Sequence, residues 1–170
     1  IVLDRLLPFG LSFLAGSSVT FTPAAAIGVF IGYFLPAVGG GGFRYLAALF
    51  AILAIKLLLN NYKKIVNNPT FLGFIAFLAN ILTSAVMLGE GDITIGQTGA
   101  ESLLCFAATF FIVKTFYILN KFSAGHTADE LSSLLIVSGI VLLGLNEITV
   151  AGISLGRILG VFMILSAAKY

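Results

Sequence analysis

Residues 39–64 read GGGGFRYLAALFAILAIKLLLNNYKK, and the apolar part of this stretch decides the fold. As a helix rising about 1.5 Å per residue, the run from Phe43 to Leu59 would be about 26 Å long, close to the thickness of a bilayer core. Its flanks differ: Arg44 follows four glycines at one end, and Lys63 and Lys64 follow the other end. Because cytoplasmic loops carry an excess of lysine and arginine, we predict a membrane-spanning helix that runs from outside to inside.

The composition extends this interpretation to the whole chain. Of 170 residues, 59% are hydrophobic and 9% are charged, whereas a soluble domain carries about 25% charged residues. So few polar side chains could not cover the apolar surface of a protein of this size in water, so we expect lipid to surround most of it. The basic residues are scattered and form no stripe that could follow a phosphate backbone, which argues against a nucleic-acid partner.

Seven apolar segments indicate an all-helical, polytopic transmembrane bundle that occupies residues 1–170. The predicted segments cover residues 6–18, 24–38, 43–59, 70–88, 98–119, 131–145 and 153–168. The first two are shorter than the roughly 20 residues that a full span requires, so they form either a pair of short spans or a re-entrant hairpin. Because Ile1 is not an initiator methionine, we expect the chain to be a fragment of a longer protein.

The lysines between segments support the orientation of the third segment. If that helix ends inside, the loops that hold Lys63, Lys64 and Lys121 lie on the cytoplasmic side, as does Lys169 after the last segment. The purely acidic loops then lie outside. Acidic residues contribute little to topology, so we treat these four lysines as its determinants.

Small residues recur every four positions in two segments. Lipid gives helices no hydrophobic reason to associate, so close backbone contact across small faces supplies the packing. Such a face either packs against another helix of the same chain or forms a dimer seam between two chains. We expect the protein to be a homo-oligomer. The two most regular faces are Gly152, Gly156 and Gly160 in the last segment and Ala24, Gly28 and Gly32 in the second.

Five ionisable residues that fall inside apolar segments need an explanation, because a charge is costly there. They are Arg44, Lys56, Glu101, Lys114 and Arg157. Lys56 and Lys114 lie close to cytoplasmic helix ends, so we expect their ammonium groups to snorkel to the interface. Glu101 and Arg157 lie about one turn inside the outer ends of their helices. We predict that Glu101 forms a buried ion pair with Arg157 or with Arg44, as a structural clamp rather than part of a proton or ion path.

The sequence offers no catalytic, cofactor-binding or metal-binding site. His126, the only histidine, lies in a polar loop far in sequence from Cys105, the only cysteine. We interpret Cys105 as a small packing residue. Asp129 and Glu130 precede an apolar segment and are typical of first-turn charges that complement a helix dipole. No Cys or His cluster has metal-ligand spacing, so we expect this fragment not to be an enzyme.

Three stretches resemble one known family, in the same order along the chain. Leu7-Pro8-Phe9-Gly10-Leu11-Ser12-Phe13 is similar to a Pro-Phe-Gly-x-x-Phe stretch near the start of the membrane region of stage II sporulation protein E. Residues 28–33, with the glycine loop and Arg44-Tyr45 that follow, resemble the next part of that region. Residues 148–168 resemble a late part of it.

The resemblance implies a multi-pass membrane protein of endospore-forming bacteria that lies at the polar division septum. It implies a cytoplasmic segment that interacts with the cell-division protein FtsZ and promotes oligomerisation. It also implies a C-terminal, manganese-dependent serine/threonine phosphatase, which acts on a phosphorylated anti-anti-sigma factor and so activates a forespore sigma factor. The present chain holds none of those soluble regions, so manganese, FtsZ and the phosphoprotein are expected to bind only outside it.

On this basis we expect the chain to be the anchoring, localisation and self-association module of a sporulation phosphatase in the cell membrane, with the lipid bilayer as its direct partner. One alternative is a small membrane transporter or channel domain, which the short helices, the glycines and the charged residues would suit. Against it stand the lack of a midplane carboxylate and of clear inverted repeats. A second alternative is a membrane assembly scaffold unrelated to sporulation.

Overall fold

The computed structural model describes residues 8–38, 43–87, 94–120, 128–145, 149–150 and 153–168. The chain divides into two compact units, which we call the first unit (residues 1–122) and the second unit (residues 123–170) and describe separately. The described part of the chain is helical apart from two strands of two residues each, so the predicted all-helical class is confirmed.

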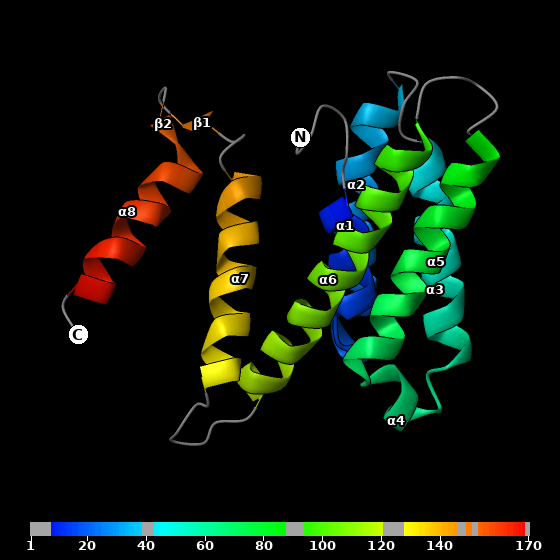
Figure 1. Cartoon of the computed structure of the whole chain (residues 1–170), viewed down its shortest axis with the longest axis horizontal. Helices are drawn as coiled ribbons and strands as arrows, with labels where there is room; N and C mark the ends of the chain where they lie inside the picture. Colours follow the sequence, from blue (N-terminus) through cyan, green and yellow to red (C-terminus); the bar gives the residue numbers. More distant parts are fainter. Residues whose placement is uncertain are drawn as a thin grey trace. The chain divides into compact units, whose positions relative to one another are not determined.

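The first unit is a bundle of antiparallel helices (Figure 1). The helices begin and end within about one turn of the predicted segments, and a short helix between the third and fourth segments is an addition. In chain order the elements are α1 (Pro8–Gly16), the 3-10 turn η1 (Val19–Phe21), α2 (Thr22–Val38), α3 (Phe43–Leu58), α4 (Lys63–Val66), α5 (Pro69–Met87) and α6 (Ile95–Asn120).

Local side-chain caps explain where the two longest helices begin. Asn68 caps α5, because its Oδ1 accepts hydrogen bonds from the backbone N–H groups of Thr70 (3.0 Å) and Phe71 (3.3 Å), and Pro69 occupies the first helical position. Thr94 and Gln97 cap α6 reciprocally: each side chain accepts from the backbone N–H of the other residue, at 3.1 and 3.3 Å. This capping box starts α6 at Ile95, three residues before the predicted segment.

Seven membrane-spanning segments were predicted, whereas two helices of the described chain, α5 and α6, pass a combined test of length and composition. Pro69–Val86 and Ile95–Leu119 are long and apolar enough, by length and composition, to cross a membrane. The helices α2 and α3 have 17 and 16 residues. The helix α1 has nine residues and would be about 14 Å long.

The short helix α1 lies inside the bundle. It packs against α2, α3, α5 and α6, and six of its residues are buried, including Leu11, Leu14 and Ala15, which have no exposed surface. The core continues into α3 with Leu49 and Ile52. Most of α1 therefore belongs to the core, whereas the side chain of Phe13 is 44% exposed.

The second unit contains a helix, a small hairpin and a second helix. Its elements are α7 (Ala128–Leu145), β1 (Thr149–Val150), β2 (Ile153–Ser154) and α8 (Leu155–Ala168). The strands pair antiparallel, with Thr149 opposite Ser154. The last predicted segment therefore begins with a strand, and the Ser154 side chain then accepts from the backbone N–H of Arg157 at 3.3 Å to start α8. Asp129 and Glu130 lie in the first turn of α7, as predicted.

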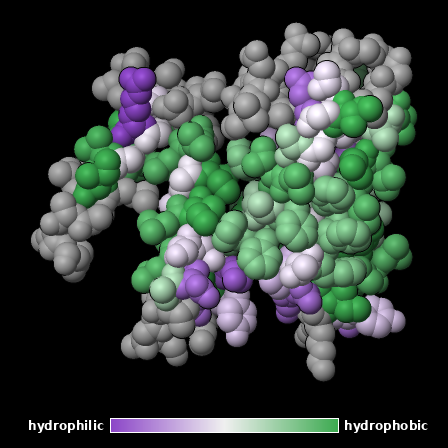
Figure 2. Space-filling model, in the orientation of Figure 1, coloured by the Kyte–Doolittle hydropathy of each residue, from purple (hydrophilic) through white to green (hydrophobic). Residues whose placement is uncertain are grey.

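The outer surface of the first unit is apolar. Figure 2 shows hydrophobic side chains over the middle of its helices, with polar side chains nearer the helix ends. More than half of the surface of Ile27, Leu82, Val86 and Leu103 is exposed. Arg44 and Lys56 of α3 and Glu101 of α6 show the opposite behaviour and are buried, so the interior of this unit holds charged side chains.

Candidate functional site

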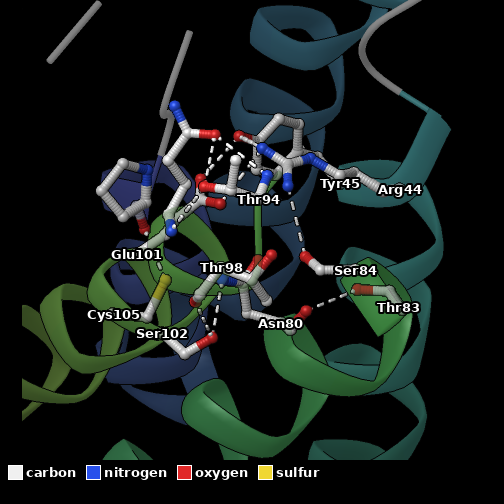
Figure 3. Close-up of polar contacts among 12 residues, drawn as sticks. Arg44, Tyr45, Asn80, Thr83, Ser84, Thr94, Thr98, Glu101, Ser102 and Cys105 are labelled. Carbon is white, nitrogen blue, oxygen red and sulfur yellow. Dashed lines mark hydrogen bonds and ion pairs between the residues drawn. The ribbon is translucent and has the colours of Figure 1, made fainter. Parts of the chain in front are cut away.

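The predicted ion pair of Glu101 forms with Arg44. Arg44 Nη2 lies 3.1 Å from Glu101 Oε2, and the two side chains are 5% and 0% exposed. The Tyr45 hydroxyl donates to the other carboxylate oxygen of Glu101 at 2.5 Å. Two consecutive residues in the first turn of α3 thus hold one carboxylate of α6 (Figure 3). The opposite charges compensate each other in the buried interior of the unit.

Arg44 also connects α3 to α5. Its Nη1 donates to Ser84 Oγ at 3.3 Å, and Nη2 donates to the Tyr45 hydroxyl. The guanidinium carbon lies 4.4 Å from the centre of the Tyr45 ring, within the range of a cation–π contact. One guanidinium group therefore joins three helices, through Glu101 on α6, Ser84 on α5 and its own neighbour on α3.

Two tyrosines that the sequence analysis did not single out complete this cluster. The Tyr33 ring of α2 stacks on the Tyr45 ring with the centroids 4.9 Å apart, and the Tyr33 hydroxyl accepts from the backbone N–H of Leu11 at 3.0 Å. That N–H lies in the first turn of α1, so the hydroxyl links α2 to the start of α1. The sequence does contain a signal for these two residues. A tyrosine within an apolar segment is expected to be buried, and its hydroxyl then needs a hydrogen-bond partner.

Gly10 makes room for the Tyr33 hydroxyl. A Cβ atom at Gly10 would lie 2.5 Å from Tyr33 Oη and 2.7 Å from Cζ, closer than atoms of a packed core approach. The ring cannot simply swing away, because Tyr45 stacks on it and Leu11 donates to its hydroxyl. The glycine in Pro8-Phe9-Gly10 is therefore explained by close approach of α1 and α2.

Lys56 is buried, and the prediction that it snorkels to the interface is wrong. Its side chain is 4% exposed. The ammonium group donates to the backbone oxygens of Leu14 (2.8 Å), Ala15 (3.2 Å) and Ser17 (2.7 Å), and to Ser17 Oγ (3.1 Å). The last carbonyls of α1 lack intrahelical donors, and a cation at this helix end also complements the helix dipole.

The structure places the other predicted residues as follows. Arg157 is exposed and lies in α8 of the second unit. Lys114 is half-buried, and its Nζ lies 4.6 Å from the centre of the Phe110 ring. Lys63 and Lys64 form the start of α4, with side chains outside the described part. Lys121, His126 and Lys169 lie outside the described residues altogether.

The two small-residue faces differ in their surroundings. Ala24, Gly28 and Gly32 on α2 are exposed, and a Cβ atom at either glycine would meet nothing within 4 Å among the described residues. In α8, Gly156 is buried, whereas a Cβ at Gly160 would meet open space. Gly152 lies outside the described residues. Within the described chain, the α2 face is therefore not covered by a neighbouring helix.

The buried groups of the described chain do not form a metal-binding or nucleophilic arrangement. The described residues contain no group of three or more His, Cys, Asp or Glu that could hold a metal ion. Cys105 is fully buried, with Sγ 3.4 Å from the backbone oxygen of Pro8. The geometry supports cross-linking of helices by polar contacts, through one ion pair at the level of Glu101 and one ammonium group at the end of α1.

Comparison with known proteins assigns the chain to a family. The family model described as SpoIIE, N-terminal domain, matches residues 1–170. No curated protein and no solved structure matches the chain. The N-terminal domain is the non-catalytic region of this sporulation protein, and the phosphatase domain lies elsewhere in the full-length protein. The resemblance expected from the sequence is thus confirmed, and the chain belongs to the SpoIIE family as its N-terminal domain.

Proposed function

We propose that this domain anchors a sporulation phosphatase in the cell membrane as a multi-pass bundle, and that it supports the localisation and self-association of the enzyme at the division septum. Family membership supports the link to the phosphatase. The observation that carries the membrane assignment is the distribution of polarity in the first unit, where large apolar side chains face outward and Arg44, Lys56 and Glu101 are buried.

Lipid is the surrounding that makes this distribution favourable. Exposure of the outward-facing apolar side chains to water would be unfavourable. In a bilayer the same side chains contact hydrocarbon, so this penalty does not arise. Helices also satisfy their own backbone groups, as a bilayer requires. The outward-facing set includes Ile27, Ile31, Phe34, Phe50, Leu57, Leu82, Val86, Leu103 and Tyr117.

The helix lengths suit four crossings and one buried helix in the first unit. At about 1.5 Å per residue, α2 and α3 are about 24–26 Å long, within a few ångströms of the hydrocarbon thickness, and α5 and α6 are longer. With nine residues, six of which are buried, α1 is on this proposal a buried helix that does not cross the membrane. The positive-inside rule places the start of α4, with Lys63 and Lys64, in the cytoplasm.

A labelling experiment tests the crossing and its direction. In a Cys105→Ser background, single cysteines replace Tyr62, after α3, or Thr94, before α6, both of which are exposed. We expect an impermeant maleimide to label Thr94→Cys in intact cells, and Tyr62→Cys only after permeabilisation. Equal labelling of both positions in intact cells would rule out a crossing by α5. The reverse pattern would overturn the orientation alone.

The α2 face supports the self-association part of the proposal. Ala24, Gly28 and Gly32 leave an open strip in the single chain, and such strips allow the close backbone approach that joins helices in lipid. Contacts with FtsZ and with the phosphorylated anti-anti-sigma factor, and the binding of manganese, belong on this proposal to soluble regions outside residues 1–170.

The buried charges favour anchoring over transport. Glu101 is held by Arg44 and Tyr45, and Lys56 is held by backbone oxygens of α1. A transport site has to exchange its partners for a substrate or ion, whereas these groups are engaged by the protein itself. They act on this proposal as clamps between helices.

A further inference from the structure

Four small polar side chains form a ring between α5 and α6. Asn80 and Ser84 lie one turn apart on α5, and Thr98 and Ser102 lie one turn apart on α6. All four are at most 3% exposed. Asn80 Nδ2 donates to Ser102 Oγ at 3.1 Å. Because the two helices run antiparallel (Figure 1), this register places Ser84 and Thr98 on the adjacent turn.

The hydrogen bonds of the ring leave two oxygens without a partner. Ser102 Oγ donates to the backbone oxygen of Thr98 at 2.8 Å, so it accepts from Asn80, and the atom of Asn80 that faces it must be the amide nitrogen. The carbonyl oxygen Oδ1 of Asn80 then points elsewhere. Neither this atom nor Thr98 Oγ1 has a hydrogen-bond partner among the described residues. Buried polar atoms without partners are rare, and ordered water commonly accounts for them.

We propose that this ring binds one ordered water molecule, hydrogen-bonded to Asn80 Oδ1 and Thr98 Oγ1. Water can donate to the carbonyl oxygen of Asn80 and either donate to or accept from the hydroxyl of Thr98, so it satisfies both atoms at once. The ring thereby gains a second link between α5 and α6, beside the direct Asn80–Ser102 bond. The inference rests on buried polar atoms alone and does not depend on the proposed function.

The neighbouring charge selects water over a metal cation. Hydroxyl and amide oxygens also suit a hard cation such as Na⁺. However, Arg44 Nη1 donates to Ser84 Oγ at 3.3 Å, so a guanidinium group already contacts the ring. Glu101 already compensates this guanidinium, so a bound cation would add an uncompensated positive charge to the buried cluster. A neutral molecule with two donors and two acceptors meets the same hydrogen-bonding demand without that cost.

A pair of isosteric substitutions provides the first test. Thr98→Val removes the hydroxyl and leaves the water with one fewer partner, so we expect the unfolding midpoint of the purified chain in detergent to fall. Thr115→Val is the matched control, because Thr115 Oγ1 is another buried hydroxyl of α6 without a partner. Valine should leave the midpoint there unchanged or raise it. If Thr98→Val also leaves the midpoint unchanged or raises it, the ring is dry and the proposal is wrong.

A direct measurement of hydration provides the second test. In the folded wild-type chain, with threonine methyl groups labelled and the detergent deuterated, we expect a nuclear Overhauser effect between water and the Thr98 methyl group. Thr109 is the control, because it is fully buried and its hydroxyl bonds to the Cys105 carbonyl at 2.7 Å. A signal at Thr98 that is absent at Thr109 supports the water. Absence at Thr98, or equal signals at both, overturns it whatever Thr98→Val does to stability.

Discussion

The Glu101 side chain has no exposed surface, so the stability lost on substitution depends on the groups that contact it. We expect Glu101→Gln and Arg44→Gln each to lower the free energy of unfolding by about 3–5 kcal/mol, because each leaves the other charge buried and unpaired. The double variant should lose clearly less than the sum. Reversible unfolding in mixed micelles measures all three variants. Arg157→Gln, at an exposed arginine of α8, is the control and should change little. Strictly additive losses would show that the two groups do not interact.

Lys56 provides a second prediction, because its ammonium group is the donor for the end of α1. Lys56→Met keeps the apolar stem and removes contacts to Leu14, Ala15 and Ser17. We expect a loss of about 1–3 kcal/mol per carbonyl left without a donor, and faster amide exchange around Ser17. Lys114→Met is the comparison, since half-buried Lys114 contacts only an aromatic face among the contacts described. Equal exchange in both variants would argue against a capping role for Lys56.

Glu101 and Lys56 show how much of the environment of a single residue can be predicted from the sequence. Position along a helix indicates the depth of Glu101, Arg44 and Arg157, and so narrowed the partners of Glu101 to two arginines. Position along a helix does not indicate which helices are neighbours. Because α3 is the neighbour that brings an arginine to Glu101, the ion pair forms with Arg44. For Lys56, the distance to the end of α3 suggested an exposed ammonium group, but the end of α1 lies at the same depth and offers acceptors. Contacts between helices that are far apart in the chain cannot be predicted from a single sequence.

Among the helices, α1 and α2 meet closely enough to restrict side-chain size. We expect Gly10→Ala to destabilise the domain by about 1–3 kcal/mol, because its methyl group would overlap the fixed Tyr33 ring. Gly28→Ala is the matched control on α2, where the added methyl meets open space, and the better helix propensity of alanine should leave stability unchanged or raised. Thermal unfolding in detergent compares them. Gly10→Ala as stable as Gly28→Ala would mean that α1 and α2 are not held this tightly.

Helix boundaries follow from the sequence more directly than helix environments. Asn68-Pro69 and the apolar runs place α3 and α5 within about one turn, because caps and composition act locally. The burial of α1 was not evident, since a short helix that is apolar all round looks alike whether lipid or protein surrounds it. The two-residue strands before α8 were also missed, because Ile153 and Ser154 continue the apolar run that follows them.

At the scale of the whole molecule, the described part of the first unit leaves the small-residue face of α2 open to another molecule. In a Cys105→Ser background, we expect cysteines at Gly28 and Gly32 to crosslink between chains in native membranes. A cysteine at Leu82, an exposed position of α5, should not crosslink. The reason is that the small residues of α2, unlike Leu82, allow two backbones to approach closely. Equal crosslinking at all three positions would indicate random collisions and would remove the support for a seam on α2.

The enclosure of α1 has a consequence for biosynthesis. A chain leaves the ribosome from its N-terminus, so α1 is made before α3, α5 and α6, the helices that surround it. Until Lys56 has been synthesised, the carbonyl groups at the end of α1 lack their ammonium donor. Until Cys105 has been synthesised, Ser12 lacks the carbonyl that lies 3.1 Å from its hydroxyl. The contacts that hold α1 in the bundle are therefore complete only after most of the first unit has been synthesised.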